Sequence, residues 1–179
     1  SMSAHSTTKD AELIILGGGC AGLSLAARLA AETPALKVLV IEPRLAYQED
    51  RTWCGWRLRP HLFEDCAIAR WNQWRVVTPS AVIERSSKLY PYEMIRSDLF
   101  YDKASAAIMH APAASILHGA SADTLVETKS QVEVRLSDGT ALRAPWVVDT
   151  RPPHLDVKPP WLWQNFVGFV VELEPTSSG

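Results

Sequence analysis

Residues 12–22 read Glu-Leu-Ile-Ile-Leu-Gly-Gly-Gly-Cys-Ala-Gly, an apolar run that leads directly into a cluster of glycines. Gly17, Gly19 and Gly22 have the G-x-G-x-x-G spacing. In this motif the first glycine allows a tight turn, the second lets the backbone approach a pyrophosphate, and the third lets a helix pack closely on the strand. Glu42 ends the next apolar run, where a carboxylate can accept hydrogen bonds from ribose hydroxyls. The pattern predicts a dinucleotide-binding βαβ unit.

The helix that should begin at these glycines contributes to binding through its backbone. Gly18, Cys20 and Ala21 lie at its N-terminus, where free N–H groups and a partial positive charge favour phosphate. Cys20 has no basic neighbour in the sequence, which predicts an unreactive thiol. An acid at Glu42 favours a free ribose 2′-hydroxyl and so disfavours NADP, but the motif alone does not separate FAD from NAD.

Composition excludes several classes of protein. The chain has 179 residues and a formal net charge of -2, which suits one ordinary domain and gives no reason to expect nucleic acid as a partner. The three cysteines form neither a metal-binding spacing nor a disulfide framework, and the five histidines are dispersed, so we expect no metal and a reducing, cytoplasmic compartment. No apolar run is long enough to span a membrane.

Seven tryptophans are a high number for this length. Large aromatic side chains in that number suit a big apolar ligand or a surface that faces a membrane. Ordinary packing in the core is the alternative for each of them.

The order of the expected elements indicates a nucleotide domain that is interrupted by an inserted sheet, because a plain dehydrogenase would alternate strand and helix more regularly. We expect strands over 12–17, 37–42, 70–78, 81–85, 116–118, 132–136, 140–144, 146–149 and 164–174. We expect helices over 20–32, 61–69 and 98–110, the last with Ser97 as its N-cap, and an irregular segment over 43–60.

These elements define expected boundaries. They are a disordered leader with a tag remnant (1–10), the dinucleotide-binding βαβ unit and its loop (11–60), the start of an inserted substrate-side sheet (61–95), a return to the first domain (96–153) and the start of a substrate-domain strand (154–179). The fold class is α/β, with a Rossmann-like unit and an inserted mixed or antiparallel sheet.

Four further segments, together with the glycine motif and Glu42, resemble the FAD-dependent lycopene cyclases of carotenoid synthesis. The segments are Asp50-Arg51-Thr52-Trp53-Cys54-Gly55-Trp56, Tyr92-Glu93-Met94-Ile95-Arg96-Ser97-Asp98-Leu99-Phe100-Tyr101, Val147-Val148-Asp149-Thr150-Arg151-Pro152-Pro153 and Trp163-Gln164-Asn165-Phe166-Val167-Gly168-Phe169-Val170-Val171-Glu172. The chain departs from the wider flavoprotein group at Arg151-Pro152, where a glycine is usual. The resemblance implies an FAD-binding domain like that of the flavoprotein hydroxylases.

The resemblance also implies a reaction. In this family a proton adds to a terminal double bond of an acyclic carotene such as lycopene, and the carbocation closes a ring without net redox change. Reduced FAD, with NAD(P)H as electron source, is expected to stabilise the cation. A complete cyclase is longer, so the usual acidic motif is expected beyond residue 179. This chain should be an N-terminal part that is inactive without a C-terminal half or a second chain.

Individual residues acquire candidate roles from this resemblance. Trp53 and Trp56 could contact the cation or the polyene, or simply pack the loop onto the sheet. Glu49 and Asp50 are weak candidates for a proton donor, and only if burial raises the pKa of the carboxyl.

Two more residues are candidate flavin ligands. Arg96 aligns with an arginine that reaches the flavin pyrophosphate in related proteins, and its alternative is a surface salt bridge. Asp149 could face the ribityl chain or the phosphates, or cap the end of its strand.

Two alternatives remain open. One is an FAD-dependent monooxygenase or isoprenoid reductase of the same fold, which would turn over NAD(P)H with net redox change. The other is a non-catalytic dinucleotide-binding fragment. The apolar substrate implies peripheral contact with a membrane, although this sequence shows no basic amphipathic helix to make that contact.

Overall fold

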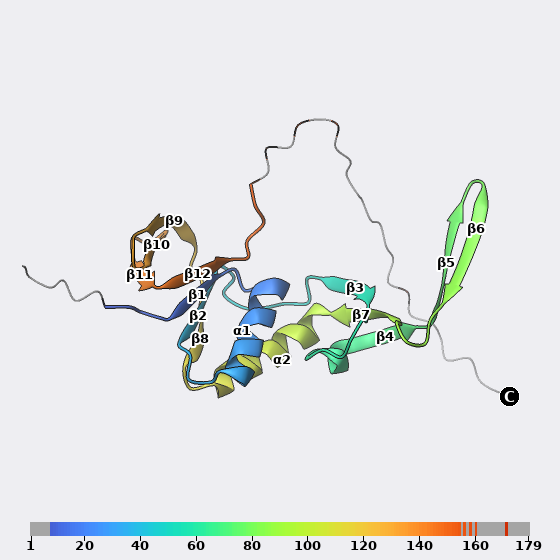
Figure 1. Ribbon diagram of the computed structural model, residues 1–179, viewed down its shortest axis with the longest axis horizontal. Helices are drawn as coiled ribbons and strands as arrows, with labels where there is room; N and C mark the ends of the chain where they lie inside the picture. Colours follow the sequence, from blue (N-terminus) through green and yellow to red (C-terminus); the bar gives the residue numbers. More distant parts are fainter. Residues whose placement is uncertain (1–7, 155, 157, 159, 161–170, 172–179) are drawn as a thin grey trace, which may run out of the picture.

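The computed structural model describes residues 8–154, 156, 158, 160 and 171, and the strand expected over 164–174 lies outside the described residues. Four parallel strands form the central sheet, in the order β12-β1-β2-β8 (Figure 1). They are β1 (Leu13–Leu16), β2 (Val38–Glu42), β8 (Ala114–His118) and β12 (Trp146–Asp149). The predicted opening unit is confirmed, because α1 (Cys20–Glu32) connects two parallel strands, β1 and β2.

Side chains alternate between the two faces along each strand, so the central sheet carries one hydrophobic cluster on each face. On one face, Ile15 and Val40 pack against α1 and α2 (Ser97–His110). On the other, Ile14, Leu16 and Ile41 pack against a second, antiparallel sheet. That sheet has the order β11-β10-β9 and consists of β9 (Ala122–Glu127), β10 (Val132–Leu136) and β11 (Ala141–Ala144). Strands buried on both faces read as continuous apolar runs, as β1 and β2 do.

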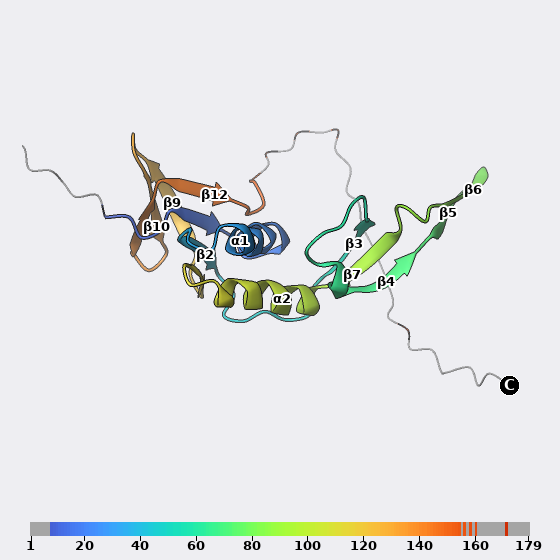
Figure 2. The ribbon, with the colours of Figure 1, turned by 60° about the horizontal axis from the view of Figure 1, so that its bottom comes forward.

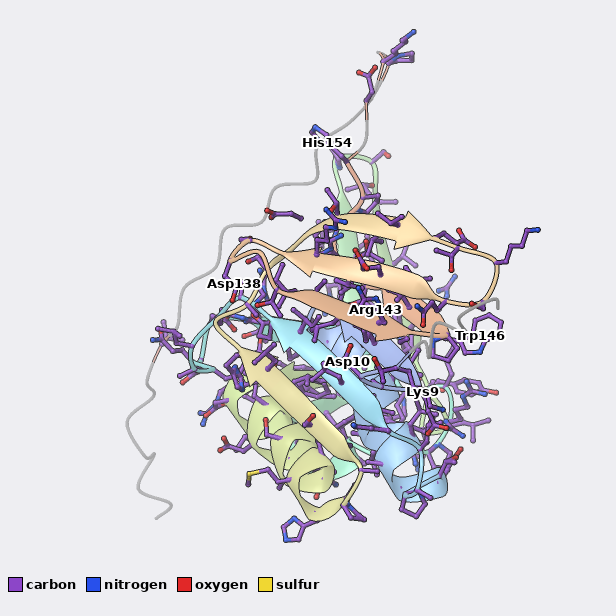
Figure 3. All side chains as sticks on the ribbon, turned by 90° about the vertical axis from the view of Figure 1, so that its left-hand side faces the viewer. Lys9, Asp10, Asp138, Arg143, Trp146 and His154 are labelled. Atoms are coloured by element: carbon purple, nitrogen blue, oxygen red, sulfur yellow. The ribbon has the colours of Figure 1, made fainter. Side chains whose placement is uncertain are left out.

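The N-terminal segment is tied to the antiparallel sheet. Asp10 donates its N–H to the carbonyl of Arg143 at 2.8 Å, and the N–H of Arg143 donates to Asp10 Oδ2 at 2.8 Å. Figure 3 shows this pair beside β11, with Trp146 at the start of β12 and exposed to solvent.

A third sheet lies on the far side of the helices, away from β9–β11 (Figure 2). It has the antiparallel order β3-β7-β4, built from β3 (Thr52–Trp56), β7 (Tyr92–Arg96) and β4 (Ala67–Trp71). A separate hairpin of β5 (Gln73–Thr78) and β6 (Ala81–Ser86) extends from it. This is the inserted sheet that the order of elements predicted.

Three local predictions were wrong in this region. The segment 43–60 contains β3, which forms because it pairs with β7 about forty residues later, a contact that local sequence does not show. The helix expected over 61–69 is only a short 3₁₀ turn, Glu64–Cys66, before β4 begins. The strand expected over 70–78 is two strands, because β4 pairs with β7 and β5 with β6.

Ser97 has a different role from the predicted one. Helix α2 begins at Ser97 itself, and Arg96 occupies the N-cap position without a side-chain cap. The hydroxyl oxygen of Ser97 instead accepts the N–H groups of Asp50 (3.1 Å) and Arg51 (3.0 Å). The serine therefore ties the loop before β3 to the start of α2. In the described part of the chain, no helix is long and apolar enough to cross a membrane.

Candidate dinucleotide site

The glycine turn between β1 and α1 leaves no room for a side chain at Gly17, Gly18 or Gly22. Gly17 has φ of +94°, a conformation that L residues with a side chain rarely adopt. A Cβ on Gly22 would overlap the carbonyl oxygen of Gly17 and lie 3.0 Å from its carbonyl carbon. The turn is also held from the next strand, because the N–H of Gly17 donates to the carbonyl of Ile41 at 2.9 Å.

Gly19 differs from its neighbours because it faces open space. A Cβ there would meet nothing within 4 Å, and Gly19 and Cys20 both line a cavity. Helix α1 begins at Cys20 with no side-chain cap and no acidic residue in its first turn. Its first intrahelical bond runs from the N–H of Leu23 to Gly19 O, so the N–H groups before it are available to an anion. This is the arrangement that the motif predicted for phosphate.

The cavity measures about 480 Å³, within the usual range of small-molecule sites. Its walls come from the glycine turn, the end of β2, the loop before β3, α2 and the ends of β8 and β12. The lining residues are Leu16, Gly17, Gly19, Cys20, Ile41, Glu42, Pro43, Arg44, Arg51, Trp53, Tyr101, Ala120, Ser121, Ala122, Thr150, Arg151 and Pro152.

Glu42 lies at the edge of this cavity and is almost fully buried, at 3% exposure. Its Oε2 accepts the N–H of Gly18 at 2.7 Å, and its Oε1 accepts the backbone N–H and Nε of Arg44 at 2.9 and 2.7 Å. Burial raises the pKa of Glu42, but the bonds from Arg44 and Gly18 outweigh it, so the pKa lies below its ordinary value. A carboxylate has about four acceptor positions, and Oε2 uses one of its two for the N–H of Gly18.

Arg44, which the sequence did not single out, holds the Glu42 carboxylate. Its guanidinium carbon lies 4.9 Å from the ring centroid of Tyr47 and 5.3 Å from that of Tyr101, and the two rings stack at 4.3 Å. Its Nη1 also donates to Asp50 Oδ2 at 2.9 Å. Arg44 therefore connects Glu42 to Tyr101 of α2 and to the loop before β3. The signal in the sequence was a basic residue two positions after Glu42.

The structure places Asp50 in this network rather than free in a pocket. Its Oδ1 accepts the hydroxyl of Tyr101 at 3.0 Å. Burial raises the pKa of Asp50, but the bonds from Tyr101 and Ser97 and the charge of Arg44 outweigh it and lower the pKa. The condition for a proton donor, a raised pKa, is therefore absent. Glu49 is exposed and lies 3.5 Å from Arg96, as an exposed ion pair.

Arg96 and Asp149 are not among the residues that line the cavity. Arg96 donates twice to Asp98, at 2.7 Å each, so it forms the salt bridge that was the alternative for it. Asp149 accepts the N–H and side chain of Arg151 at 2.8–3.0 Å. Thr150 reaches the glycine turn instead, since its hydroxyl donates toward the carbonyls of Leu16 (2.8 Å) and Gly17 (3.1 Å).

The two tryptophans of β3 have separate surroundings. Trp53 lines the cavity and packs edge-on against Phe100 and Tyr101, with centroids at 5.1 and 5.8 Å. Trp56 is half-exposed and contacts Trp74 instead. Trp53 and Cys20 also line a second cavity of about 620 Å³ between α1 and the β3–β7 pair. Its lining is mostly apolar and includes Phe63, Ile95 and Phe100, with Arg28, Glu32 and His61 among the polar members. Burial raises the pKa of the Cys20 thiol, as expected for an unreactive cysteine.

The network predicts a dependence of stability on pH. Glu42 and Asp50 have folded pKa values below their ordinary values of 4.5 and 3.8. Their contribution is therefore present above those values and is lost as the pH falls through the folded pKa values. We expect the free energy of unfolding in urea to fall more between about pH 5 and about pH 2 in the natural protein than in Arg44→Met. If the free energy of unfolding fell by the same amount with pH in both proteins, Arg44 would not be what lowers the pKa values of Glu42 and Asp50.

Comparison with solved structures places this architecture among flavoproteins. The probable FAD-dependent monooxygenase pqsL from Pseudomonas aeruginosa superposes with a TM-score of 0.62 at 15% identity, covering 76% of this chain and 41% of that one. The p-nitrophenol 4-monooxygenase PnpA from Pseudomonas putida gives 0.61 at 15%, covering 78% and 40%. The flavin-dependent monooxygenase PieE, solved with FAD and substrate, gives 0.60 at 16%, covering 78% and 30%. The fold is thus the α/β flavoprotein fold, and the chain spans 30–41% of these proteins' length.

Comparison of sequences gives a more specific result. No curated protein sequence matches the chain. The family described as "Lycopene cyclase protein" matches residues 12–177, which is nearly the whole chain. The chain therefore belongs to the lycopene cyclase family.

Proposed function

We propose that this chain binds FAD at the glycine turn, as the cofactor-binding part of an enzyme that closes rings at the ends of an acyclic carotene. One observation carries the cofactor proposal. The uncapped start of α1, the open face of Gly19 and the buried carboxylate of Glu42 all border the same cavity. A pyrophosphate needs free N–H groups at a helix start, and the neighbouring ribose needs a carboxylate acceptor beside them.

The residues present fit such a cofactor. Backbone N–H groups at Gly19, Cys20 and Ala21 would receive the pyrophosphate, and the free acceptor position of Glu42 would receive a ribose hydroxyl. Arg51 lines the same cavity and brings positive charge to it, whereas the charge of Arg151, which also lines the cavity, is paired with Asp149. Arg44 holds Glu42 in place and does not itself need to touch the ligand.

The apolar cavity beside this site suits a polyene. Trp53 lines both cavities, so a hydrocarbon chain end on the Phe63–Phe100 side would lie next to the dinucleotide. Bound reduced flavin would supply negative charge that stabilises a carbocation in a dry site. The face of Trp53 can add cation–π stabilisation. We place lycopene or a similar acyclic carotene here as substrate, with NAD(P)H as electron source and the proton donor outside these residues.

Cofactor binding is tested by the absorption spectrum of the purified chain before and after it is mixed with FAD. We expect a protein-bound flavin band that Gly19→Val removes, because the valine side chain would enter the cavity. The circular dichroism of Gly19→Val should stay that of a folded protein. Equal flavin binding by both proteins, or tighter binding of NAD than of FAD, would overturn the proposal.

Ring formation requires a chain with the remaining part of the protein. With reduced FAD and lycopene, we expect cyclic product without stoichiometric consumption of NAD(P)H. A monooxygenase or reductase of the same fold would consume one NAD(P)H for each product, and that result would replace cyclisation by the alternative activity.

A further inference from the structure

Thr150 fills a niche that two glycines of the turn leave open. It directly follows β12, whose last residue, Asp149, pairs with Leu16 of β1. A Cβ on Gly17 would lie 2.9 Å from the hydroxyl oxygen of Thr150, and a Cβ on Gly22 would lie 3.0 Å from it. Both distances are shorter than an ordinary van der Waals contact. The first and third glycines of the motif therefore make room for this hydroxyl as well as for the turn.

Hydrogen bonds to β1 and to the turn fix the position of this side chain. The N–H of Thr150 donates to the carbonyl of Leu16 at 2.9 Å. The hydroxyl donates toward the carbonyls of Leu16 and Gly17, at 2.8 and 3.1 Å, so its single hydrogen is shared between two acceptors. A β-branched side chain also has few rotamers to choose from. The hydroxyl is thus held against the turn from the β12 side.

The peptide group between Gly17 and Gly18 is consequently held at both of its ends. Its N–H, from Gly18, donates to Oε2 of Glu42 at 2.7 Å, and its carbonyl, from Gly17, accepts from Thr150. Strand β1 lies between β2 and β12 in the sheet, so the two contacts come from opposite sides. Glycine backbone rotates more freely than that of other residues. The two contacts together fix the direction in which the chain enters α1, and with it the direction of the free N–H groups there.

We infer that Thr150 is a positioning residue for the pyrophosphate of the bound dinucleotide, and the counterpart of Glu42 on the other side of the turn. This inference rests on the proposed binding of FAD at the glycine turn. Thr150 acts through the carbonyl of Gly17 and does not need to touch the phosphate. Without the hydroxyl, Glu42 alone holds the Gly17–Gly18 peptide. A smaller fraction of the chains then presents its N–H groups in the binding geometry, and the apparent affinity falls with that fraction.

Three substitutions of Thr150 test the inference in the 179-residue chain. Thr150→Val keeps the shape without the hydroxyl, Thr150→Ala removes the hydroxyl without placing a methyl group near the carbonyls, and Thr150→Ser keeps the hydroxyl. Flavin fluorescence measures the Kd for FAD, and displacement of FAD measures the Kd for ADP and for adenosine. We expect Thr150→Val and Thr150→Ala to raise the Kd for FAD and ADP about tenfold, the usual effect of one lost hydrogen bond. Thr150→Ser should restore both values. Adenosine, which has no phosphate, should bind all four proteins equally.

A matched control removes a bond of the same kind elsewhere. The hydroxyl of Thr128, in the turn between β9 and β10, donates to the carbonyl of Gln131 at 2.9 Å. Thr128→Ala should leave the three Kd values unchanged. Hydrogen exchange of the Gly18 N–H, measured without cofactor, reports on the peptide itself. This exchange should be faster in Thr150→Val than in the natural chain and unchanged in Thr128→Ala.

Several results would overturn the inference while leaving FAD binding in place. They are equal FAD affinity of the natural chain and Thr150→Val, a loss that Thr150→Ser does not restore, equal weakening of ADP and adenosine, or unchanged exchange at Gly18. A natural chain that binds neither FAD nor ADP is a different result, because it removes the proposed function and the positioning role together.

Discussion

Gly22→Ala is expected to destabilise the protein by about 3 kcal/mol and to lower the melting temperature by about 10 °C. The added Cβ would overlap the carbonyl oxygen of Gly17. The contact is with backbone rather than with the end of a flexible side chain, so α1 must shift away from β1. Urea unfolding monitored by circular dichroism measures the loss.

Gly19→Ala provides the control for this prediction, because it makes the same chemical change three residues earlier in open space. It should cost about 1 kcal/mol or less, mainly because alanine is a poorer N-cap than glycine. The two variants separate packing from binding, since both should weaken flavin binding but only Gly22→Ala should lose much stability. Similar stability of the two variants would show that α1 can move at little cost.

Glu42→Gln is expected to cost about 3 kcal/mol and to abolish detectable flavin retention. The buried carboxylate accepts three hydrogen bonds, from Gly18 and Arg44. A glutamine of the same size has one carbonyl oxygen, so its NH₂ group must face an N–H donor, and the charge of Arg44 loses its closest partner. Urea unfolding and the flavin spectrum measure the two effects.

The matched control is Glu32→Gln, which removes a carboxylate from an ion pair of the same residue types. Glu32 lies 3.0 Å from Arg28 with both side chains more than half exposed. Exposed pairs contribute little, so the cost should stay under about 0.5 kcal/mol. A Glu42→Gln variant that lost no more stability than Glu32→Gln would show that the buried network is not what holds the glycine turn.

Local sequence determined the opening unit of this protein. The run from residue 12 to Gly22 predicts a strand, a turn and a helix because each requirement is local: apolar residues for a buried strand, glycines where a side chain cannot fit, and helix-forming residues afterwards. Helix α1 has the predicted bounds, Cys20–Glu32. Glu42 was predicted from its distance to the motif, and the structure places it beside the turn through its bond to Gly18.

The tertiary structure decided which charged side chains meet at the site. Arg96 and Asp149 were candidates by resemblance, yet each is paired with a residue two positions away, Asp98 and Arg151 respectively. Asp50 is instead held by Tyr101, which is 51 residues later in the sequence. The Arg44 network joins the end of β2, the loop before β3 and α2, which are distant in sequence. Strand β3 likewise exists because it pairs with β7. Glycine turns and amphipathic periods are properties of neighbouring residues. The contacts of Tyr101 with Arg44 and Asp50, like strand pairing, depend on how distant segments pack.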